Sequence, residues 1–205
     1  MIGMKSVGMV TGGGEFDAGA YRAMVALARH LTWLNGAAGW WSDYGLALFL
    51  VLAAAGWWRM RGQGTPALVR ALWVPAAMAV AVAVSAALKL AVAEQRPCRT
   101  FPAVHIAAAC PGVADYSFPS NHAVLAGAAA MAVWAAVGGW LGVVAVANAV
   151  LISVSRIYLG LHYPHDVVVG LLLGVAVAWA GPRLGARVEP RVGRLRSAAV
   201  GHRRT

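Results

Sequence analysis

The side chains best suited to chemistry stand at the ends of this sequence's apolar runs. They are Lys89, Arg96, Ser120, Asn121, His122, Arg156, His162 and Asp166. Ionisable residues at membrane depth are costly, so they are candidates for function. Lys89, Arg96 and Arg156 are cations without matching carboxylates, which favours an anionic ligand. A phosphate suits them, because it accepts charge-assisted hydrogen bonds and binds well at helix N-termini.

His162 and Asp166 are spaced like a nucleophile and the carboxylate that orients it. Pro164 lies between them and is favoured at the first position of a helix, which puts Asp166 at the third, within reach of His162. A carboxylate that accepts one ring N–H fixes the tautomer and leaves the other nitrogen free to attack. The structural alternative is a helix-start aspartate, favoured by the dipole, beside an interfacial histidine.

His122 falls in the first turn of another expected helix, after Ser120 and Asn121. Histidine suits a general acid because its pKa lies near working pH. Serine and asparagine are also ordinary N-cap residues. The cations have structural alternatives too, since Lys89 is close enough to a span end to snorkel, and an arginine there can be a loop or anchor residue.

These residues require a scaffold of apolar helices. Of 205 residues, 60% are hydrophobic and 12% are charged, against roughly 25% charged in a soluble domain. Five segments approach the length of about 20 apolar residues that spans a bilayer: 38–58, 70–93, 121–138, 140–159 and 164–182. The sequence therefore predicts an all-α integral membrane bundle with five transmembrane helices.

Segment 16–35 has a different pattern. Phe16, Met24, Leu27 and Leu31 recur at helical spacing, while arginines interrupt the apolar residues. This pattern favours an amphipathic helix at the membrane interface over a sixth span, which is the alternative.

Charge predicts the orientation of the chain. The net charge is +10, and arginines concentrate in the connection 59–70 and in the C-terminal tail. Both are therefore expected to be cytoplasmic, which places loops 94–120 and 157–163, with the candidate site, on the extracytoplasmic side of the plasma membrane. No aromatic–basic pattern indicates nucleic-acid binding. The expected parts of the chain are a flexible leader (1–15), one membrane domain (16–182) and a basic cytoplasmic tail (183–205).

Three motifs follow one another along the chain. They are Lys89-LAVAEQ-Arg96-Pro97, Pro119-Ser120-Asn121-His122 and Ser155-Arg156-IYLGL-His162-YPH-Asp166. In this order they resemble the type-2 phosphatidate phosphatase superfamily, over about residues 38–180. Asn121 stands where that family usually has glycine. Some small bacterial undecaprenyl-diphosphate phosphatases also lack this glycine, and Glu94 and Asp115 are similar to that branch.

The resemblance implies a membrane lipid phosphatase that works without a metal or other cofactor. His162 is implied as the residue that becomes a phosphohistidine, His122 as the general acid and Asp166 as the partner of His162. The residues implied for phosphate binding are Lys89, Arg96, Ser120, Asn121 and Arg156. The favoured substrate is undecaprenyl or another polyprenyl diphosphate, which implies a role in cell wall biogenesis. The alternatives are phosphatidate, phosphatidylglycerol phosphate and a polyprenyl-phosphosugar phosphate.

Two other classes of protein share some of these sequence features. A vanadium-dependent haloperoxidase shares the anion-binding motifs, but those enzymes are soluble. A lipid-binding or transport protein predicts ionisable residues along a path across the bilayer, whereas here the inner halves of the spans lack charge.

The expected outer loop carries two further predictions. Cys98 and Cys110 both lie in it and are expected to form a disulfide, because the outer compartment permits oxidation; two free cysteines are the alternative. The remaining polar residues near the motifs could contact a second phosphate or belong to the loop surface, and they are Glu94, Arg99, His105, Asp115 and His165.

Overall fold

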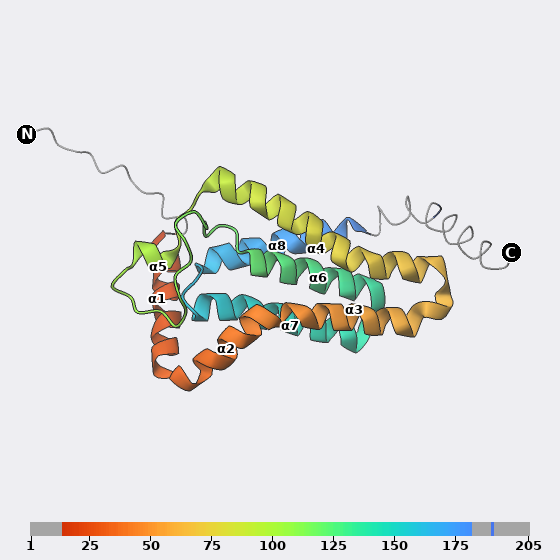
Figure 1. Ribbon diagram of the computed structural model, residues 1–205, viewed down its shortest axis with the longest axis horizontal. Helices are drawn as coiled ribbons and strands as arrows, with labels where there is room; N and C mark the ends of the chain where they lie inside the picture. Colours follow the sequence, from red (N-terminus) through yellow and green to blue (C-terminus); the bar gives the residue numbers. More distant parts are fainter. Residues whose placement is uncertain (1–13, 182–189, 191–205) are drawn as a thin grey trace, which may run out of the picture.

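The chain folds into a bundle of helices joined by loops (Figure 1). The computed structural model describes residues 14–181 and residue 190, and in this part it contains no β-strand, so the predicted all-α class is confirmed. The elements are α1 (Gly14–His30), α2 (Thr32–Tyr44), α3 (Leu46–Met60), the 3₁₀ turn η1 (Arg61–Gln63), α4 (Thr65–Val92), α5 (Pro97–Thr100), α6 (Asn121–Val137), α7 (Gly139–Tyr158) and α8 (Pro164–Trp179). Apart from residues 14, 15 and 190, the predicted leader and basic tail lie outside the described residues.

Helix α1 lies across one end of the bundle, whereas the longer helices run along it (Figure 1). Its inward face buries Tyr21, Val25 and Ala28, and its outward face exposes Phe16 and Leu27. A crosswise helix with one apolar face exposed is typical of an interfacial element. This arrangement favours the predicted interfacial helix over a sixth span.

Two breaks divide the N-terminal region where the sequence predicted continuous helices. The first lies at Leu31, inside the predicted segment 16–35, and separates α1 from α2. The second lies at Gly45, inside the predicted span 38–58, where α2 and α3 meet at a bend of 51°. The Gly45 carbonyl accepts a hydrogen bond from Asn148 Nδ2 of α7 at 2.9 Å. Hydrophobicity predicted the apolar character of this segment but not the tertiary contact at its bend.

The apolar helices differ in length. Among the described residues, Thr65–Thr100 and Gly139–Tyr158 are long and apolar enough to cross a membrane, and the bent pair α2–α3 adds a third. Helices α6 and α8 are apolar but have only 17 and 16 residues. At 1.5 Å per residue they reach about 25 Å, against a hydrocarbon core of about 30 Å. The predicted count of five spans is therefore not confirmed, because helix length supports two or three.

Helix α6 forms the centre of the bundle, packed against α4, α7 and α8. Its contact with α8 is close: a Cβ on Gly127 would lie 2.4 Å from a backbone oxygen of α8, and one on Gly174 would lie 2.1 Å from a backbone oxygen of α6. Small residues allow such close approach between membrane helices. The start of α6 meets the start of α8, where the Ser120 N–H donates to the Asp166 carbonyl at 3.1 Å.

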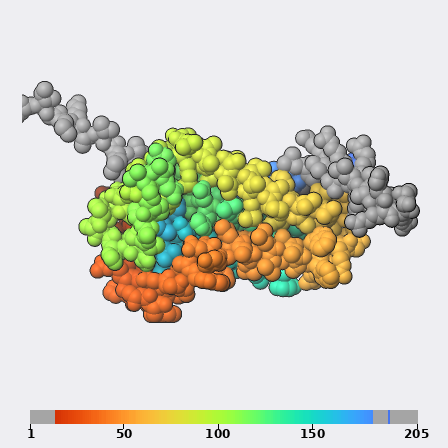
Figure 2. Space-filling view, viewed as in Figure 1, coloured from red at the N-terminus to blue at the C-terminus, as the bar shows by residue number. Residues whose placement is uncertain are grey.

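The two ends of the bundle carry different segments. The loop 101–120 gathers beside α1 and α2 at one end, as Figure 2 shows. The connection between α3 and α4, which contains Arg61, lies at the other end (Figure 1). The loops predicted to face opposite sides of the membrane thus occupy opposite ends of the molecule.

Candidate active site

The predicted nucleophile and its carboxylate meet at the start of α8. The helix begins at Pro164, as expected, and Asp166 reaches back from its third position. Asp166 Oδ2 lies 3.3 Å from His162 Nδ1 and accepts a hydrogen bond from the Tyr163 backbone N–H at 2.9 Å. Both members of the pair are buried. The four-residue spacing therefore produces the contact that the sequence predicted.

The other ring nitrogen of His162 faces Arg96, with 3.0 Å between Arg96 Nη1 and His162 Nε2. A guanidinium only donates hydrogen bonds. Nε2 therefore offers its lone pair, and the ring proton lies on Nδ1, toward Asp166. Burial lowers the pKa of His162 to about 4, despite an opposing contribution from the hydrogen bond to Asp166, so the ring is neutral at neutral pH. An unprotonated nitrogen held beside a cation is suited to attack on phosphate.

Two of the predicted phosphate-binding cations meet on one carboxylate, Asp115. Its Oδ1 lies 2.9 Å from Arg96 Nη2 and 3.7 Å from Lys89 Nζ. Its backbone oxygen also accepts from Arg96 Nε at 2.8 Å, and Lys89 donates to the carbonyl of Tyr116. Partial burial acts to raise the pKa of Asp115, but the hydrogen bond and charge of Arg96 lower it overall. An ionised, half-exposed carboxylate thus stands between two buried cations.

The third cation, Arg156, is held from another direction. Its Nη1 donates to Ser42 Oγ at 2.7 Å and lies 3.9 Å from Asp43 Oδ1, which ties α7 to α2. Its Nε has no protein partner in the described part of the chain. The charge of Arg156 acts on both His162 and His122. Arg156 and His122 therefore lie within electrostatic range of the dyad.

Ser120 and Asn121 stand at the N-terminus of α6. Ser120 occupies the N-cap position, but its side chain makes no capping hydrogen bond. It is fully buried, and its Oγ has no partner among the described residues. Asn121 Oδ1 instead accepts a hydrogen bond from Ser85 Oγ of α4 at 2.7 Å. The ordinary capping role considered for Ser120 is therefore not the one its side chain has here.

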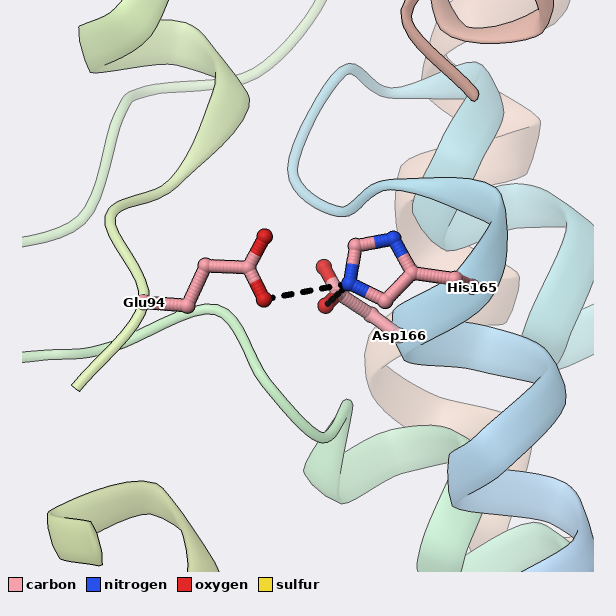
Figure 3. Close-up of side chains that lie close together, drawn as sticks. All are labelled: Glu94, His165 and Asp166. Atoms are coloured by element: carbon pink, nitrogen blue, oxygen red, sulfur yellow. Dashed lines mark hydrogen bonds and ion pairs between the residues drawn. The ribbon is translucent and has the colours of Figure 1, made fainter. Parts of the chain in front are cut away.

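The ring of His165 lies between Glu94 and the backbone of α8, close to the Asp166 carboxylate (Figure 3). Its Nε2 is 3.0 Å from Glu94 Oε2 and 3.2 Å from Asp166 Oδ1, and its Nδ1 is 2.8 Å from Asp17 Oδ2. The ligand atoms of Glu94, His165 and Asp166 lie within 4.8 Å of one another, close enough to surround a metal ion. The distances to Glu94 and Asp17 also suit hydrogen bonds from a protonated ring, whereas Asp166 Oδ1 has no hydrogen-bond partner among the described residues. The metal-free site stays a prediction.

Three side chains around the site were missed by the sequence interpretation: Asp17, Ser42 and Ser117. Ser117 Oγ donates to Asp166 Oδ2 and lies 3.5 Å from His162 Nδ1. Its position just before the second motif was the only local signal. Asp17 had an ordinary explanation as an acid in the first turn of a helix, and Ser42 lay within an apolar run.

A disulfide closes the loop that follows Arg96. Cys98 and Cys110 are joined as predicted, with their Cα atoms 6.0 Å apart. Arg99 donates to the carbonyl of Pro111, across the same loop. Arg99 therefore supports the loop itself, and His105 lies exposed on the loop surface.

Comparison with known families supplies the decisive observation. The model of the PAP2 superfamily matches residues 70–188, more than half of the chain. The chain belongs to the PAP2 superfamily. The resemblance inferred from the three motifs is confirmed, and all three lie within the matched region.

The relatives of this PAP2 chain include several named phosphatases. It is 42% identical to decaprenylphosphoryl-5-phosphoribose phosphatase of Mycobacterium tuberculosis over 98 residues, which is 48% of this chain and 51% of that protein. It is 41% identical to undecaprenyl-diphosphatase of Sulfolobus acidocaldarius over 64 residues, 31% of each protein. The chain thus matches a third to a half of the length of these relatives. The bacitracin transport permease protein BcrC of Bacillus licheniformis is 28% identical over 83% of both chains.

A solved structure shares the fold. A transmembrane PAP2-type phosphatidylglycerolphosphate phosphatase from Bacillus subtilis superposes with a TM-score of 0.61 at 20% identity, covering 84% of this chain and 86% of that one. The apolar helices, which by length and composition supply two or three membrane spans among the described residues, identify the PAP2 chain as a membrane protein. The names of its relatives support the predicted phosphatase class.

Proposed function

We propose that this PAP2 protein is a plasma-membrane phosphatase that hydrolyses a polyprenyl diphosphate, such as undecaprenyl diphosphate, to the monophosphate. The observation that carries the proposal is the environment of the His162 ring. Its Nδ1 faces Asp166 at 3.3 Å, and its Nε2 lies 3.0 Å from a cation that belongs to the phosphate-binding motif. A neutral, oriented nitrogen next to phosphate-binding cations matches the requirements of phosphoryl transfer through a phosphohistidine.

In the first step His162 Nε2 attacks the terminal phosphorus. The new N–P bond forms as the P–O bond to the lipid monophosphate breaks, and His122 donates a proton to the departing oxygen. Asp166 stabilises the positive charge that develops on the His162 ring. Lys89 and Arg96 bind the equatorial oxygens, over which negative charge spreads in the transition state. Arg156, whose Nε has no partner within residues 14–181, completes this set of cations.

In the second step a water molecule attacks the phosphohistidine. His122, now neutral, takes a proton from the water, the N–P bond breaks, and inorganic phosphate leaves. His162 returns to its neutral state with the ring proton on Nδ1. The hydroxyl of Ser120 has no partner in the described part of the chain, so this hydroxyl and the start of α6 are available to bind phosphate oxygens in both steps.

In the membrane, we place the site at the extracytoplasmic face and the C-terminus in the cytoplasm. Five crossings are made by the bent pair α2–α3 and by α4, α6, α7 and α8, with α1 in the outer interface. The shorter α6 and α8 are accommodated by local thinning of the bilayer. Arginines near the α3–α4 connection set the orientation. The lipid tail then stays in the bilayer while its headgroup reaches the site.

A second candidate substrate is a polyprenyl-phosphosugar phosphate. It is favoured by the 42% identity to the mycobacterial phosphatase over about half of each chain. The enzyme would then break a phosphomonoester bond and not a phosphoanhydride bond. The same His162 chemistry applies, because the attacked phosphorus carries the same terminal oxygens.

Phosphate release from a panel of lipids tests the proposal. The purified protein is assayed with polyprenyl diphosphate, polyprenyl-phosphopentose phosphate, phosphatidylglycerol phosphate and phosphatidate, with His162→Ala as the blank. We expect the highest kcat/KM for polyprenyl diphosphate; a higher value for the phosphopentose lipid would assign the second candidate. No release from any of them would favour a lipid-binding or transport protein. Vanadate should inhibit and EDTA should not.

A further inference from the structure

The two carboxylate oxygens of Asp166 have different surroundings. Oδ2 receives the dyad contact from His162 and hydrogen bonds from Ser117 and Tyr163. Oδ1 lies 3.2 Å from His165 Nε2, in a fully buried position. What His165 carries at Nε2 therefore decides the charge next to the carboxylate that orients the nucleophile.

His165 is surrounded by acceptors. Asp17 Oδ2 lies 2.8 Å from Nδ1, and Glu94 Oε2 lies 3.0 Å from Nε2 on the side opposite the backbone of α8. Asp17 is 5% exposed, Glu94 8% and Asp166 0%. Ionised carboxylates only accept hydrogen bonds, and a neutral imidazole has a single N–H to donate. Both ring nitrogens of His165 can be satisfied only if both carry a proton.

The ring of His165 is also fixed in place. It stacks between Phe118 and Tyr163, with both centroid distances at 5.6 Å and interplanar angles of 25° and 20°. The His165 backbone N–H donates to Asp17 Oδ1 at 3.1 Å, so Asp17 holds the residue at two points. The ring cannot turn away from its three carboxylates without losing these contacts.

We infer that His165 is a positioning residue that acts on His162 through Asp166. As an imidazolium it places a positive charge 3.2 Å from Oδ1 and keeps the carboxylate ionised, so that Oδ2 stays available to the His162 N–H. It also joins three separate parts of the chain: Asp17 of α1, Glu94 after α4 and Asp166 of α8. The crosswise helix α1 thereby becomes part of the support of the dyad. This inference rests on the proposed phosphatase function.

The pH profile of His165→Gln separates this role from a purely structural one. Removing a cation next to Asp166 raises the proton affinity of the Asp166–His162 pair. We expect kcat/KM to fall about tenfold at neutral pH, and its acid limb to move upward by about one pH unit. Titration of the substrate contributes equally to wild type and variant. His105→Gln, which changes an exposed histidine, should leave both quantities unchanged.

Three outcomes of the kinetic experiment would overturn the inference. The first is lower activity with an unmoved acid limb, which is the signature of a structural role. The second is activity equal to wild type. The third is one equivalent of divalent metal in the purified wild-type protein that is lost from His165→Gln, because an ion and not a proton would then join the carboxylates.

A direct measurement of protonation does not depend on turnover or on the folding of the variant. The chain has six histidines, and nitrogen NMR of ¹⁵N-histidine-labelled wild-type protein distinguishes doubly protonated rings from neutral ones. We expect one ring to remain doubly protonated at pH 8, where ordinary histidines are neutral. Six neutral rings at that pH would overturn the inference even if phosphatase activity is present. A doubly protonated ring in a protein that releases no phosphate would instead count against the proposed function alone.

Discussion

The two sides of the His162 ring are built differently. On the Nε2 side, Arg96 and Lys89 share the carboxylate of Asp115, whose side chain is 51% exposed. On the Nδ1 side, Asp166 is fully buried and is contacted on both of its oxygens. An anion from solvent can therefore replace the Asp115 carboxylate on the Nε2 side, whereas the Asp166 carboxylate on the Nδ1 side is not accessible to such replacement. The difference matches what a phosphatase needs, namely a replaceable anion at the phosphate-binding cations and a fixed carboxylate behind the nucleophile.

The presence of the Asp115 carboxylate on the Nε2 side has an energetic explanation. Leaving buried cations without a counter-ion is costly, and removing one partner of a buried pair is strongly destabilising. Asp115 offsets this cost when no substrate is bound. We therefore expect an entering phosphate to displace the Asp115 carboxylate, and Asp115 to help displace the product phosphate.

Replacing His162, whose ring lies between the two sides, should have the largest effect on activity. His162→Ala should lower phosphate release by more than roughly 10³-fold, as expected for removal of a nucleophile. The variant should keep the thermal unfolding temperature of the wild type within a few degrees. His105→Ala is the matched control and should retain full turnover. Retention of a tenth of wild-type activity by His162→Ala would exclude His162 as the nucleophile.

The next largest effect on activity is expected from replacing Asp166, on the Nδ1 side of the ring. Asp166→Asn keeps the size of the side chain but removes its charge, so the His162 tautomer is no longer enforced. Turnover should fall by roughly 10²–10⁴-fold. Vanadate binding should be retained, because Arg96 and Lys89 are unchanged. A variant that loses vanadate binding but keeps turnover would reverse the roles assigned to the two sides.

On the Nε2 side, replacing Asp115 should strengthen the binding of anions and not weaken it. Asp115→Asn removes the anion that competes with phosphate at Arg96 and Lys89. The inhibition constants of vanadate and inorganic phosphate should therefore fall about tenfold, the equivalent of one charge-assisted hydrogen bond. Steady-state inhibition at constant ionic strength measures the change. Weaker vanadate inhibition in this variant would show that Asp115 supports the ligand and does not compete with it.

The disulfide between Cys98 and Cys110 affects one side of the His162 ring only, because it closes the loop that follows Arg96. Replacing Cys98 and Cys110 by serine should reduce the free energy of unfolding by about 2–4 kcal/mol. We expect KM to rise a few-fold while kcat changes little, since Arg96 is less restrained and the dyad is untouched. A thiol count on unreduced, denatured wild-type protein checks the bond itself. Two reactive thiols would contradict it.

The smallest expected effect is the loss of activity in mild acid. The pKa of His162 lies at about 4, below its ordinary value, so the neutral nucleophile is present above that pH and is lost as pH falls through it. At pH 5 only about a tenth of His162 should be protonated, whereas an exposed histidine would be almost fully charged. Single-turnover kcat/KM between pH 4 and 7, with a substrate of known titration, measures this limb. A limb centred near 6.5 would mean that the dyad is open to water.

Local spacing predicted the parts of the site that are close in sequence. The contact between His162 and Asp166 follows from one helix start, and α8 begins where Pro164 indicated. The contributions of Asp17 and Ser42 come from residues more than a hundred positions away from their partners, and no local pattern specifies them. The same reason explains the bend at Gly45, which is fixed by contact with α7. The predicted count of five spans is not confirmed, because α6 and α8 have only 17 and 16 residues.

The close packing of α6 and α8 has a mechanical consequence. His122 is the second residue of α6, and His162 stands two residues before α8. The two helices pack closely from their first turns, where a Cβ on Gly174 would lie 2.1 Å from the backbone oxygen of Val124. The distance between the helices at this contact therefore sets the distance between their first turns, which hold the two histidines. A methyl group added at Gly174, which is not itself a proposed site residue, should therefore push the helices apart and move His122 away from His162.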